Sequence, residues 1–176
     1  NGGKGAAVIA GLYVADNMNF THAIQIDADG QHDLAAVTDF LDQARHNPQA
    51  LVCGYPVYDQ TVPLARLWGR ELTNFWVHVN TRSKALKDAM CGFRVYPIAQ
   101  TLPVLPSVRT RRMDFDPDIA VRLLWAGVPV INRPVRVTYP KDGISHFRGF
   151  SDNMRISRLH AGHFCTMLLR RMGLAK

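Results

Sequence analysis

The segment 22–53 constrains the fold most, because it alternates between strand-like and helix-like patterns. Residues 22–26 form a short apolar run typical of a strand, and 50–53 form a second one. Between them, the apolar positions of 34–44 repeat with the 3.6-residue period of a helix, and Asp33 is suited to cap its start. A strand, a helix and a strand in this order predict a right-handed parallel crossover and therefore an α/β domain.

Two aspartates follow the first strand directly, in the motif Asp27-Ala28-Asp29-Gly30. Side chains two apart on an extended chain point the same way, so both carboxylates are expected at the carboxyl end of the strand, where open α/β sheets bind ligands. Such oxygen donors suit a Mg²⁺ or Mn²⁺ ion that carries phosphate oxygens. An exposed acidic turn is the structural alternative. An EF-hand loop is excluded, because the glycine stands fourth rather than sixth and position twelve is not a glutamate.

The net charge of +7 lies entirely in the last quarter of the chain. Residues 1–132 hold as many acidic as basic side chains, whereas 133–176 hold nine lysines and arginines against two aspartates. This asymmetry predicts an anionic partner, and the alternatives are a diphosphate, an anionic membrane surface and nucleic acid. Nucleic acid is the least favoured of these, because no recognised binding motif accompanies the charge.

The composition of the chain favours one domain in a reducing cytoplasm. With 47% hydrophobic residues in 176, the chain is long enough for a sizeable core. Its three widely spaced cysteines predict neither a disulfide framework nor a zinc site. No apolar run approaches the roughly 18 residues that span a bilayer. The sequence starts at a helix entry, so we expect the first strands of the domain to be missing.

Three further groups of residues are candidates for binding or catalysis. Lys4 lies in a glycine-rich helix start that resembles a phosphate-binding turn, although it lacks the P-loop pattern and a purely structural turn is equally compatible. Arg70 is expected on a long amphipathic helix, where it contacts a diphosphate or forms an ordinary surface ion pair. Asp114 and Asp116 precede a helix, where carboxylates stabilise the helix dipole, and a buried member of the pair is suited to act as a general base.

The loop 139–148 combines a glycine, a hydroxyl, an imidazole and two cations. This composition is typical of a lid over an anionic substrate, and a solvated basic loop is the alternative. The residues that would bind the substrate are Lys141, Ser145, His146 and Arg148. Further on, His160 and His163 are spaced to share a metal, but without a third ligand surface or interfacial histidines are favoured.

The segment 151–176 is expected to be a basic amphipathic helix, distinct from the main domain at 1–150. It sets apolar residues beside two cations, as interfacial helices do on anionic membranes. We therefore expect the protein to be peripheral on the cytoplasmic face of a membrane. The residues that suggest this are Phe164, Met167, Leu168, Leu169, Arg170 and Arg171.

Five motifs, taken in order, resemble the family 2 glycosyltransferases, and in particular the polyprenyl-phosphate branch that includes dolichol-phosphate-mannose synthase. They cover nearly the whole chain. The motifs begin at Asn1 (Asn-Gly-Gly-Lys-Gly), Asp27 (Asp-Ala-Asp-Gly-Gln-His-Asp), Cys91 (Cys-Gly-Phe-Arg), Met113 (Met-Asp-Phe-Asp) and Gly143 (Gly-Ile-Ser-His-Phe). The resemblance implies a GT-A fold, an α/β Rossmann-like sheet with flanking helices that binds a nucleotide-sugar and a divalent metal.

The resemblance also implies roles for single residues. Asp27, Ala28 and Asp29 match the Asp-x-Asp motif that meets the metal and the nucleotide-sugar, and Gln31 matches a glutamine that completes the metal site. Lys4 and Arg94 lie in two of the motifs and are expected to contact the donor.

Other positions of the branch lie near the acceptor or the diphosphate. Asp114 matches an acidic residue near the acceptor, and Arg70 is similar to a helix arginine near the diphosphate or the acceptor phosphate. Ser145 lies in the loop that closes over the diphosphate. His146 replaces the usual lysine there, and Lys141 or Arg148 is expected to supply the charge.

The predicted function is inverting, Mg²⁺- or Mn²⁺-dependent transfer of a sugar from a nucleotide-sugar to a lipid-linked or lipid-phosphate acceptor. Asp114 or Asp116 would act as the base for an alcohol acceptor. Two alternatives remain at this point. One is a sugar-phosphate nucleotidyltransferase of related fold, and the other is a non-catalytic membrane-docking, sugar-binding module.

Overall fold

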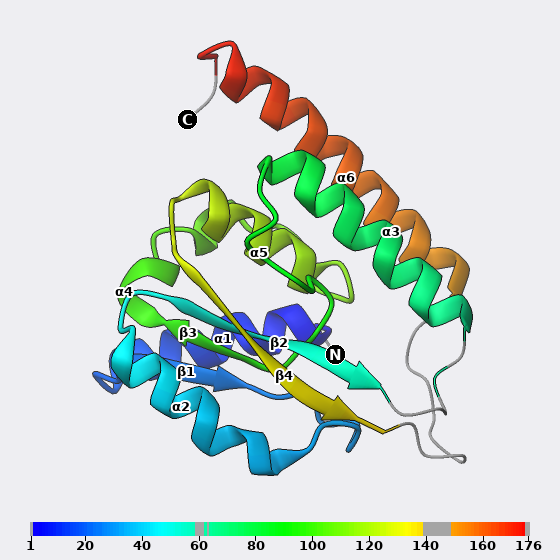
Figure 1. The fold of residues 1–176 in the computed structure, drawn as a ribbon. Coiled ribbons are helices and arrows are strands. Elements are labelled where there is room, and N and C mark those ends of the chain that lie inside the picture. Colours follow the sequence, from blue (N-terminus) through cyan, green and yellow to red (C-terminus); the bar gives the residue numbers. More distant parts are fainter. Residues whose placement is uncertain (1, 59–61, 63, 139–148, 175–176) are drawn as a thin grey trace.

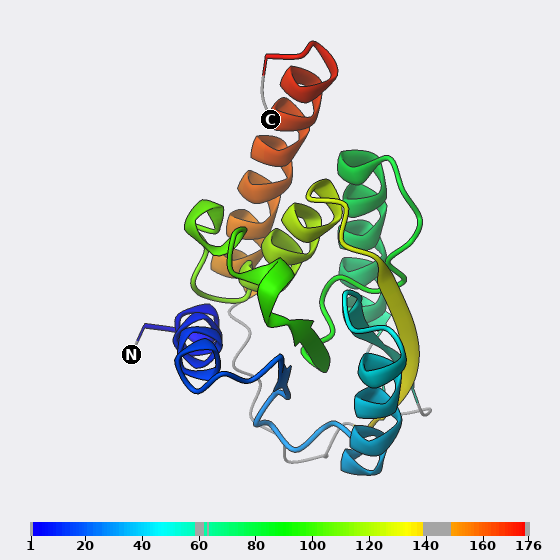
Figure 2. The same cartoon turned by 90° about the vertical axis from the view of Figure 1, so that its left-hand side faces the viewer.

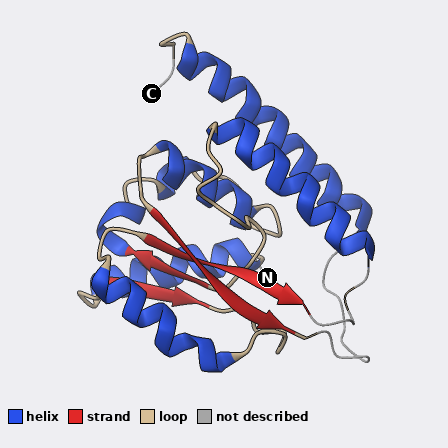
Figure 3. Cartoon of the chain, in the orientation of Figure 1, coloured by secondary structure: helices blue, strands red, loops and turns tan. Residues whose placement is uncertain are grey.

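A mixed sheet forms the centre of the molecule. A computed structural model describes residues 2–58, 62, 64–138 and 149–174, and within them four strands pair in the order β1-β3-β2-β4 (Figures 1 and 3). Strand β3 is antiparallel to both β1 and β2, and β4 is parallel to β2. The strands are β1 (His22–Gln25), β2 (Leu51–Tyr58), β3 (Arg94–Pro97) and β4 (Val130–Val137).

Helices cover both faces of this sheet. The long ones are α1 (Lys4–Asn17), α2 (Val37–His46), α3 (Leu64–Thr81), α5 (Phe115–Trp125) and α6 (Gly149–Arg171). The short ones are α4 (Ile98–Thr101) and the 3-10 helices η1 (Leu34–Ala36) and η2 (Leu105–Ser107). Helices α3 and α6 lie side by side at the outer edge of the molecule, on the far side of the sheet from α2 (Figures 1 and 2).

Alternation along the strands divides the core into two layers. Leu51 and Cys53 of β2 pack toward α1, α3 and α5, whereas Val52 between them packs toward α2. On the α2 side, the rings of Phe40 and Phe93 lie 4.5 Å apart. Because neighbouring side chains of a strand point to opposite faces, a short apolar run such as that of β2 fills both layers at once.

The predicted α/β class is confirmed, with one correction to the topology. The expected strand, helix and second strand are present. Asp33 caps η1, the 3-10 turn that leads into α2, where its carboxylate accepts a hydrogen bond from the backbone of Ala35 (2.9 Å). β1 and β2 run parallel, as a crossover requires, but β3 lies between them and pairs with both. The crossover prediction missed this strand because β3 comes 36 residues after β2 in the sequence.

Helix α6 docks on α3 and α5 through a polar face. The buried residues Asp152, Ile156, His160 and His163 are three or four apart and therefore lie on one side of the helix. His163 Nε2 lies 2.9 Å from Asp118 of α5, and Asn80 of α3 donates to the carbonyl oxygen of His160 (3.3 Å). The expected C-terminal helix is thus confirmed, and the two histidines serve the interface. No helix in the described part of the chain is long and apolar enough to span a membrane.

One of the two buried histidines of this interface, His160, makes the free energy of unfolding depend on pH. Burial lowers the pKa of His160 to about 4, and His163 adds to the effect. In the unfolded chain the pKa of His160 is near 6.5, so as the pH falls the unfolded chain takes up this proton before the folded protein does. The contribution of His160 is therefore complete above pH 6.5 and lost between pH 6.5 and 4.

We expect the free energy of unfolding to fall by about 2 kcal/mol between pH 7.5 and 5 on account of this one group. Urea denaturation at both pH values measures the loss. His160→Asn keeps a polar group near Asn80 but does not titrate, so its loss should be smaller by that amount. Equal losses in the two proteins would contradict the assignment.

Candidate functional site

Two carboxylates converge on one ammonium group at the end of β1. Lys4, the first residue of α1, places its Nζ 2.7 Å from Asp27 Oδ1 and 2.5 Å from Asp116 Oδ2. Asp27 follows β1 by two positions, and Asp116 lies in the first turn of α5. Three elements that are far apart in sequence therefore meet at this point, which is the end of the strand where the aspartate motif predicted a site.

Two buried polar side chains, those of Gln25 and Tyr96, position the carboxylate of Asp116. Gln25 Nε2 donates to Asp116 Oδ1 (3.0 Å), and the hydroxyl of Tyr96 donates to Gln25 Oε1 (2.9 Å). Burial raises the pKa of Tyr96, so its hydroxyl stays protonated and can donate. Hydrogen bonds thus link the side chains of Tyr96, Gln25 and Asp116 in series, which fixes the Asp116 carboxylate in position.

The charge balance of the cluster favours a protonated lysine. Burial lowers the pKa of Lys4, but the carboxylates of Asp116 and Asp27 outweigh it and the net shift is upward. His32, just beyond the aspartate motif, shifts in the opposite direction. Burial lowers its pKa, Lys4 and Arg70 add to that, and Asp27 and Asp29 only partly offset it. The site thus combines a permanent cation with a neutral imidazole.

The loop before β3 passes directly over Asp27. A side chain at Gly92 would overlap the carboxylate of Asp27, so a larger residue there requires this carboxylate to move. The preceding turn is closed by Asp88, whose Oδ1 accepts from the backbone of Met90 (2.9 Å) and Cys91 (2.7 Å). The same oxygen accepts from Arg70 Nη1 (2.7 Å). Arg70 is therefore held against this turn, beside the site, and its guanidinium has an acidic partner.

Arg94 lies in a different place from the one expected of a donor-binding residue. Its side chain is fully buried, and its donors point to the carbonyl oxygens of Cys91 (2.9 Å), Asp116 (2.8 Å) and Ala89 (2.7 Å). It therefore ties the loop at 89–91 to the start of α5. In this position Arg94 holds the backbone of Asp116 and of the loop that passes over Asp27.

The other predicted residues fall into three groups. Ala28 and Asp29 are exposed beside Asp27, Gln31 is half-buried, and the backbone of Gln31 donates to Asp29 Oδ1 (3.1 Å). Asp114 lies at the N-cap of α5, where its Oδ1 accepts from the backbone of Arg112 (3.1 Å), outside the Lys4 cluster. The remaining predicted residues lie outside the described part of the chain: Lys141, Ser145, His146 and Arg148.

The donor set at the aspartate motif fits a hard divalent cation in its chemistry. Asp27, Asp29 and Gln31 all supply oxygen atoms, which Mg²⁺ and Mn²⁺ prefer. Asp29 is exposed and Gln31 is half-buried, whereas both oxygens of Asp27 already contact Lys4. Among the described residues, no three His, Cys, Asp or Glu side chains form a metal-binding group. A metal here would therefore rest on Asp29 and Gln31 and share Asp27 with Lys4.

The sequence analysis gave no role to four residues that shape the site. Gln25 binds Asp116, Asp88 closes the turn before β3, Gly92 lies against Asp27, and His32 is close enough to Asp27 and Asp29 to feel their charge. His32 and Gly92 carried a usable signal, because they lie within two of the motifs. Gln25 and Asp88 lie outside the motifs, so no local pattern marks them.

Comparison with known proteins supports the predicted resemblance. The chain is 24% identical over 166 residues to a dolichyl-phosphate beta-glucosyltransferase of Dictyostelium discoideum. The match covers 90% of this chain and 49% of that protein, so the chain spans about half the length of this curated relative. No protein-family model matches the chain. The resemblance to the polyprenyl-phosphate glycosyltransferases is thus confirmed.

The Lys4 cluster yields a test of stability. Lys4→Met keeps the length of the side chain but leaves the buried Asp116 without its cation. Removing one partner of a buried ion pair typically costs about 3 kcal/mol or more, so we expect a loss of that size in the free energy of unfolding. The measurement is denaturant-induced unfolding followed by circular dichroism.

Arg45→Met is the matched control for this variant. Arg45 pairs with Asp42 on the exposed side of α2, and such a surface pair is worth at most about 1 kcal/mol. A cost for Lys4→Met no larger than that of the control would show that the cluster does not stabilise the fold.

Proposed function

We propose that this chain carries the donor site of a glycosyltransferase that moves a sugar from a nucleotide-sugar to a lipid-phosphate acceptor. One observation supports it most. The carboxylates of Asp27 and Asp116 meet Lys4 at the end of β1, beside the exposed Asp29, in a chain similar to a dolichyl-phosphate beta-glucosyltransferase. Open α/β sheets bind ligands at this end of their strands.

The proposed reaction is a single displacement at the anomeric carbon, with inversion. An acceptor oxygen forms the new bond to this carbon while the bond to the diphosphate breaks, and the diphosphate leaves with the electron pair. A lipid-phosphate oxygen is already ionised, so this acceptor needs no general base. An alcohol acceptor would need one, and Asp116 is poorly suited to that role because it is bound to Lys4 and Gln25.

The residues of the site have separate tasks in this scheme. Asp27, Asp29 and Gln31 would hold the Mg²⁺ or Mn²⁺ ion, which when bound offsets the charge that develops on the diphosphate. Lys4 adds a fixed positive charge at the same point. Asp116 holds Lys4 in place. The neutral His32 offers a hydrogen-bond donor or acceptor beside Asp27 and Asp29.

Nucleotide binding by the aspartate motif can be measured directly. We expect calorimetry to show Mn²⁺-dependent binding of UDP or GDP to the wild-type chain. Asp29→Asn removes the charge of the exposed donor and should weaken binding by at least tenfold, because cation affinity depends on ligand charge. Asp42→Asn, on the exposed side of α2, is the control and should bind as the wild type. Unchanged binding in Asp29→Asn would refute the metal assignment.

The close approach of Gly92 to Asp27 gives a second test of the same site. The methyl group of Gly92→Ala would overlap the Asp27 carboxylate and force it out of position. We expect nucleotide binding to fall by at least tenfold in a protein that remains folded.

Gly11→Ala in α1 is the control, because its methyl group would meet open space. It should bind nucleotide normally and be more stable by about 0.5–1 kcal/mol. Normal nucleotide binding in Gly92→Ala would argue that Asp27 does not contact the ligand.

A further inference from the structure

The ammonium group of Lys4 has all of its hydrogen-bond donors engaged within the protein. A lysine carries three N–H donors, and three carboxylate oxygens lie within hydrogen-bond distance of Lys4 Nζ. They are Asp27 Oδ1 (2.7 Å), Asp27 Oδ2 (2.9 Å) and Asp116 Oδ2 (2.5 Å). A phosphate oxygen that binds Lys4 must therefore replace one of these carboxylate oxygens.

The two partners of Lys4 differ in their access to solvent. The side chain of Asp27 is 24% exposed, whereas that of Asp116 is 2% exposed and its other oxygen is held by Gln25 (3.0 Å). If Lys4 left Asp116, it would leave a buried charge unpaired, which is strongly unfavourable. A released Asp27 can be solvated instead. The contact between Lys4 and Asp27 is therefore the one that a ligand can open.

The ammonium group, rather than the carboxylate, is free to move when this contact opens. The loop before β3 closes one side of Asp27, since a Cβ atom at Gly92 would overlap both carboxylate oxygens. Lys4, by contrast, carries its charge on a flexible stem of four carbons. Its Nζ can turn toward a bound phosphate while it keeps the contact with Asp116.

The same contact also limits the binding of a divalent cation. Both oxygens of Asp27 contact a positive charge, so an approaching cation meets Asp29 as the exposed carboxylate of the motif. Cation affinity depends on the number of charged ligands. Full use of Asp27 by a metal thus requires that Lys4 first give up this carboxylate, which is the same change that a phosphate at Lys4 requires.

We propose that the contact between Lys4 and Asp27 couples metal binding to diphosphate binding at this site. The inference rests on the proposed function, because it assigns Asp27 to the metal and Lys4 to the diphosphate. Either ligand alone must break the contact, whereas both together break it only once. A first ligand that removes such a cost for a second one produces positive cooperativity. Free metal is consequently bound weakly, and a nucleoside diphosphate recruits it.

Removing the charge of Lys4 should have opposite effects on the two ligands. Lys4→Gln keeps a hydrogen-bond donor for Asp116 but leaves Asp27 without its cation. We expect it to bind Mn²⁺ alone about tenfold more tightly than the wild type, measured from the electron paramagnetic resonance signal of the free ion. We expect it to bind UDP or GDP at saturating Mn²⁺ about tenfold more weakly, measured by calorimetry. Mere structural damage would weaken both.

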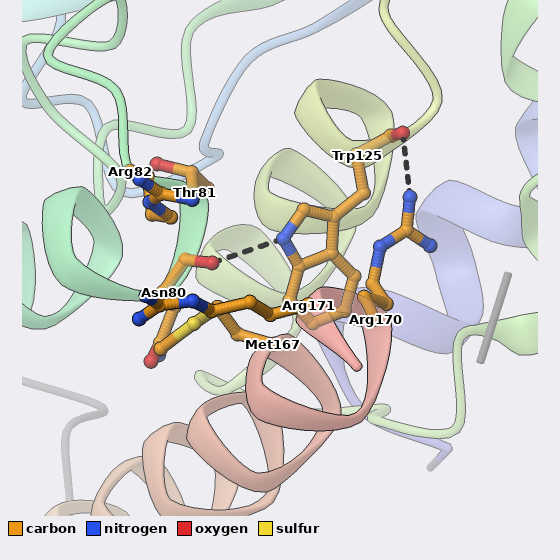
Figure 4. A pocket seen from close by; sticks show the side chains of 7 residues that line it. All are labelled: Asn80, Thr81, Arg82, Trp125, Met167, Arg170 and Arg171. Atoms are coloured by element: carbon orange, nitrogen blue, oxygen red, sulfur yellow. Dashed lines mark hydrogen bonds between the residues drawn. The ribbon is translucent and has the colours of Figure 1, made fainter. Parts of the chain in front are cut away.

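Arg82→Gln is the matched control, because it removes the same charge from another part of the molecule. Arg82 lines a cavity where α3, α5 and α6 end, together with Arg170 and Arg171 (Figure 4). This variant should bind Mn²⁺ and nucleotide as the wild type does. A gain in Mn²⁺ affinity equal to that of Lys4→Gln would overturn the proposal, since net charge alone would then explain the gain. Circular dichroism confirms that each variant is folded.

A second pair of variants tests the proposal with Lys4 unchanged. Asp29→Asn should weaken the binding of Mn²⁺ alone, whereas Asp27→Asn should leave it close to the wild-type value, because Lys4 already offsets the charge of Asp27. Equal weakening in the two variants would overturn the proposal, as would a Lys4→Gln protein that binds Mn²⁺ no more tightly than the wild type. These titrations contain no nucleotide, so a failure of UDP and GDP to bind would refute the proposed donor site separately.

Discussion

The buried carboxylate of Asp116 sets the geometry of the site. A carboxylate that is almost fully removed from water is tolerated only when it is paired and hydrogen-bonded, because the cost of desolvating an unpaired charge is several kcal/mol. Lys4, Gln25 and the hydrogen-bonded chain to Tyr96 meet that requirement. Since Lys4 begins α1 and Gln25 ends β1, satisfying Asp116 also holds the start of α1 beside the end of β1. Asp27 then shares the lysine, so the arrangement of the candidate donor site follows from the pairing of one buried charge.

The sequence predicted the local elements well and the contacts between them less well. The capped helix after Asp33 and the strand before Asp27 follow from periodicity and capping, which are properties of neighbouring residues. The insertion of β3 between β1 and β2 depends on pairing between segments about 70 residues apart, which leaves no local pattern. The same reason hides the contact between Lys4 and Asp116.

Arg94 shows how far a sequence motif can predict the role of a single residue. Its motif predicted a cation that contacts the donor, but a guanidinium can equally satisfy three backbone carbonyls in the interior, and only its burial separates the two roles. Asp29 shows the same limit for the aspartate motif, because β1 ends at Gln25 and Asp29 lies exposed in the following turn, while Asp27 alone of the two pairs with Lys4. Sequence reasoning was therefore most informative where a residue's role depends on its immediate neighbours.

Helix α6 departs from the usual distribution of side chains in a water-soluble helix. Such a helix normally buries an apolar stripe, whereas the buried side of α6 combines Ile156 with Asp152, His160 and His163, and Phe164 and Leu168 are exposed. The contact between His163 and Asp118 and the bond from Asn80 satisfy part of this polar interface. Among the described residues, Asn80 Oδ1, His160 Nε2 and His163 Nδ1 are buried without a hydrogen-bond partner. The exposed apolar residues of α6 meet those of α3 instead, since the rings of Phe164 and Trp76 lie 6.3 Å apart. The domain therefore has two distinct surfaces, a charged strand end around Lys4 and an apolar pair of helices, and the polar contacts of α6 hold the second one together.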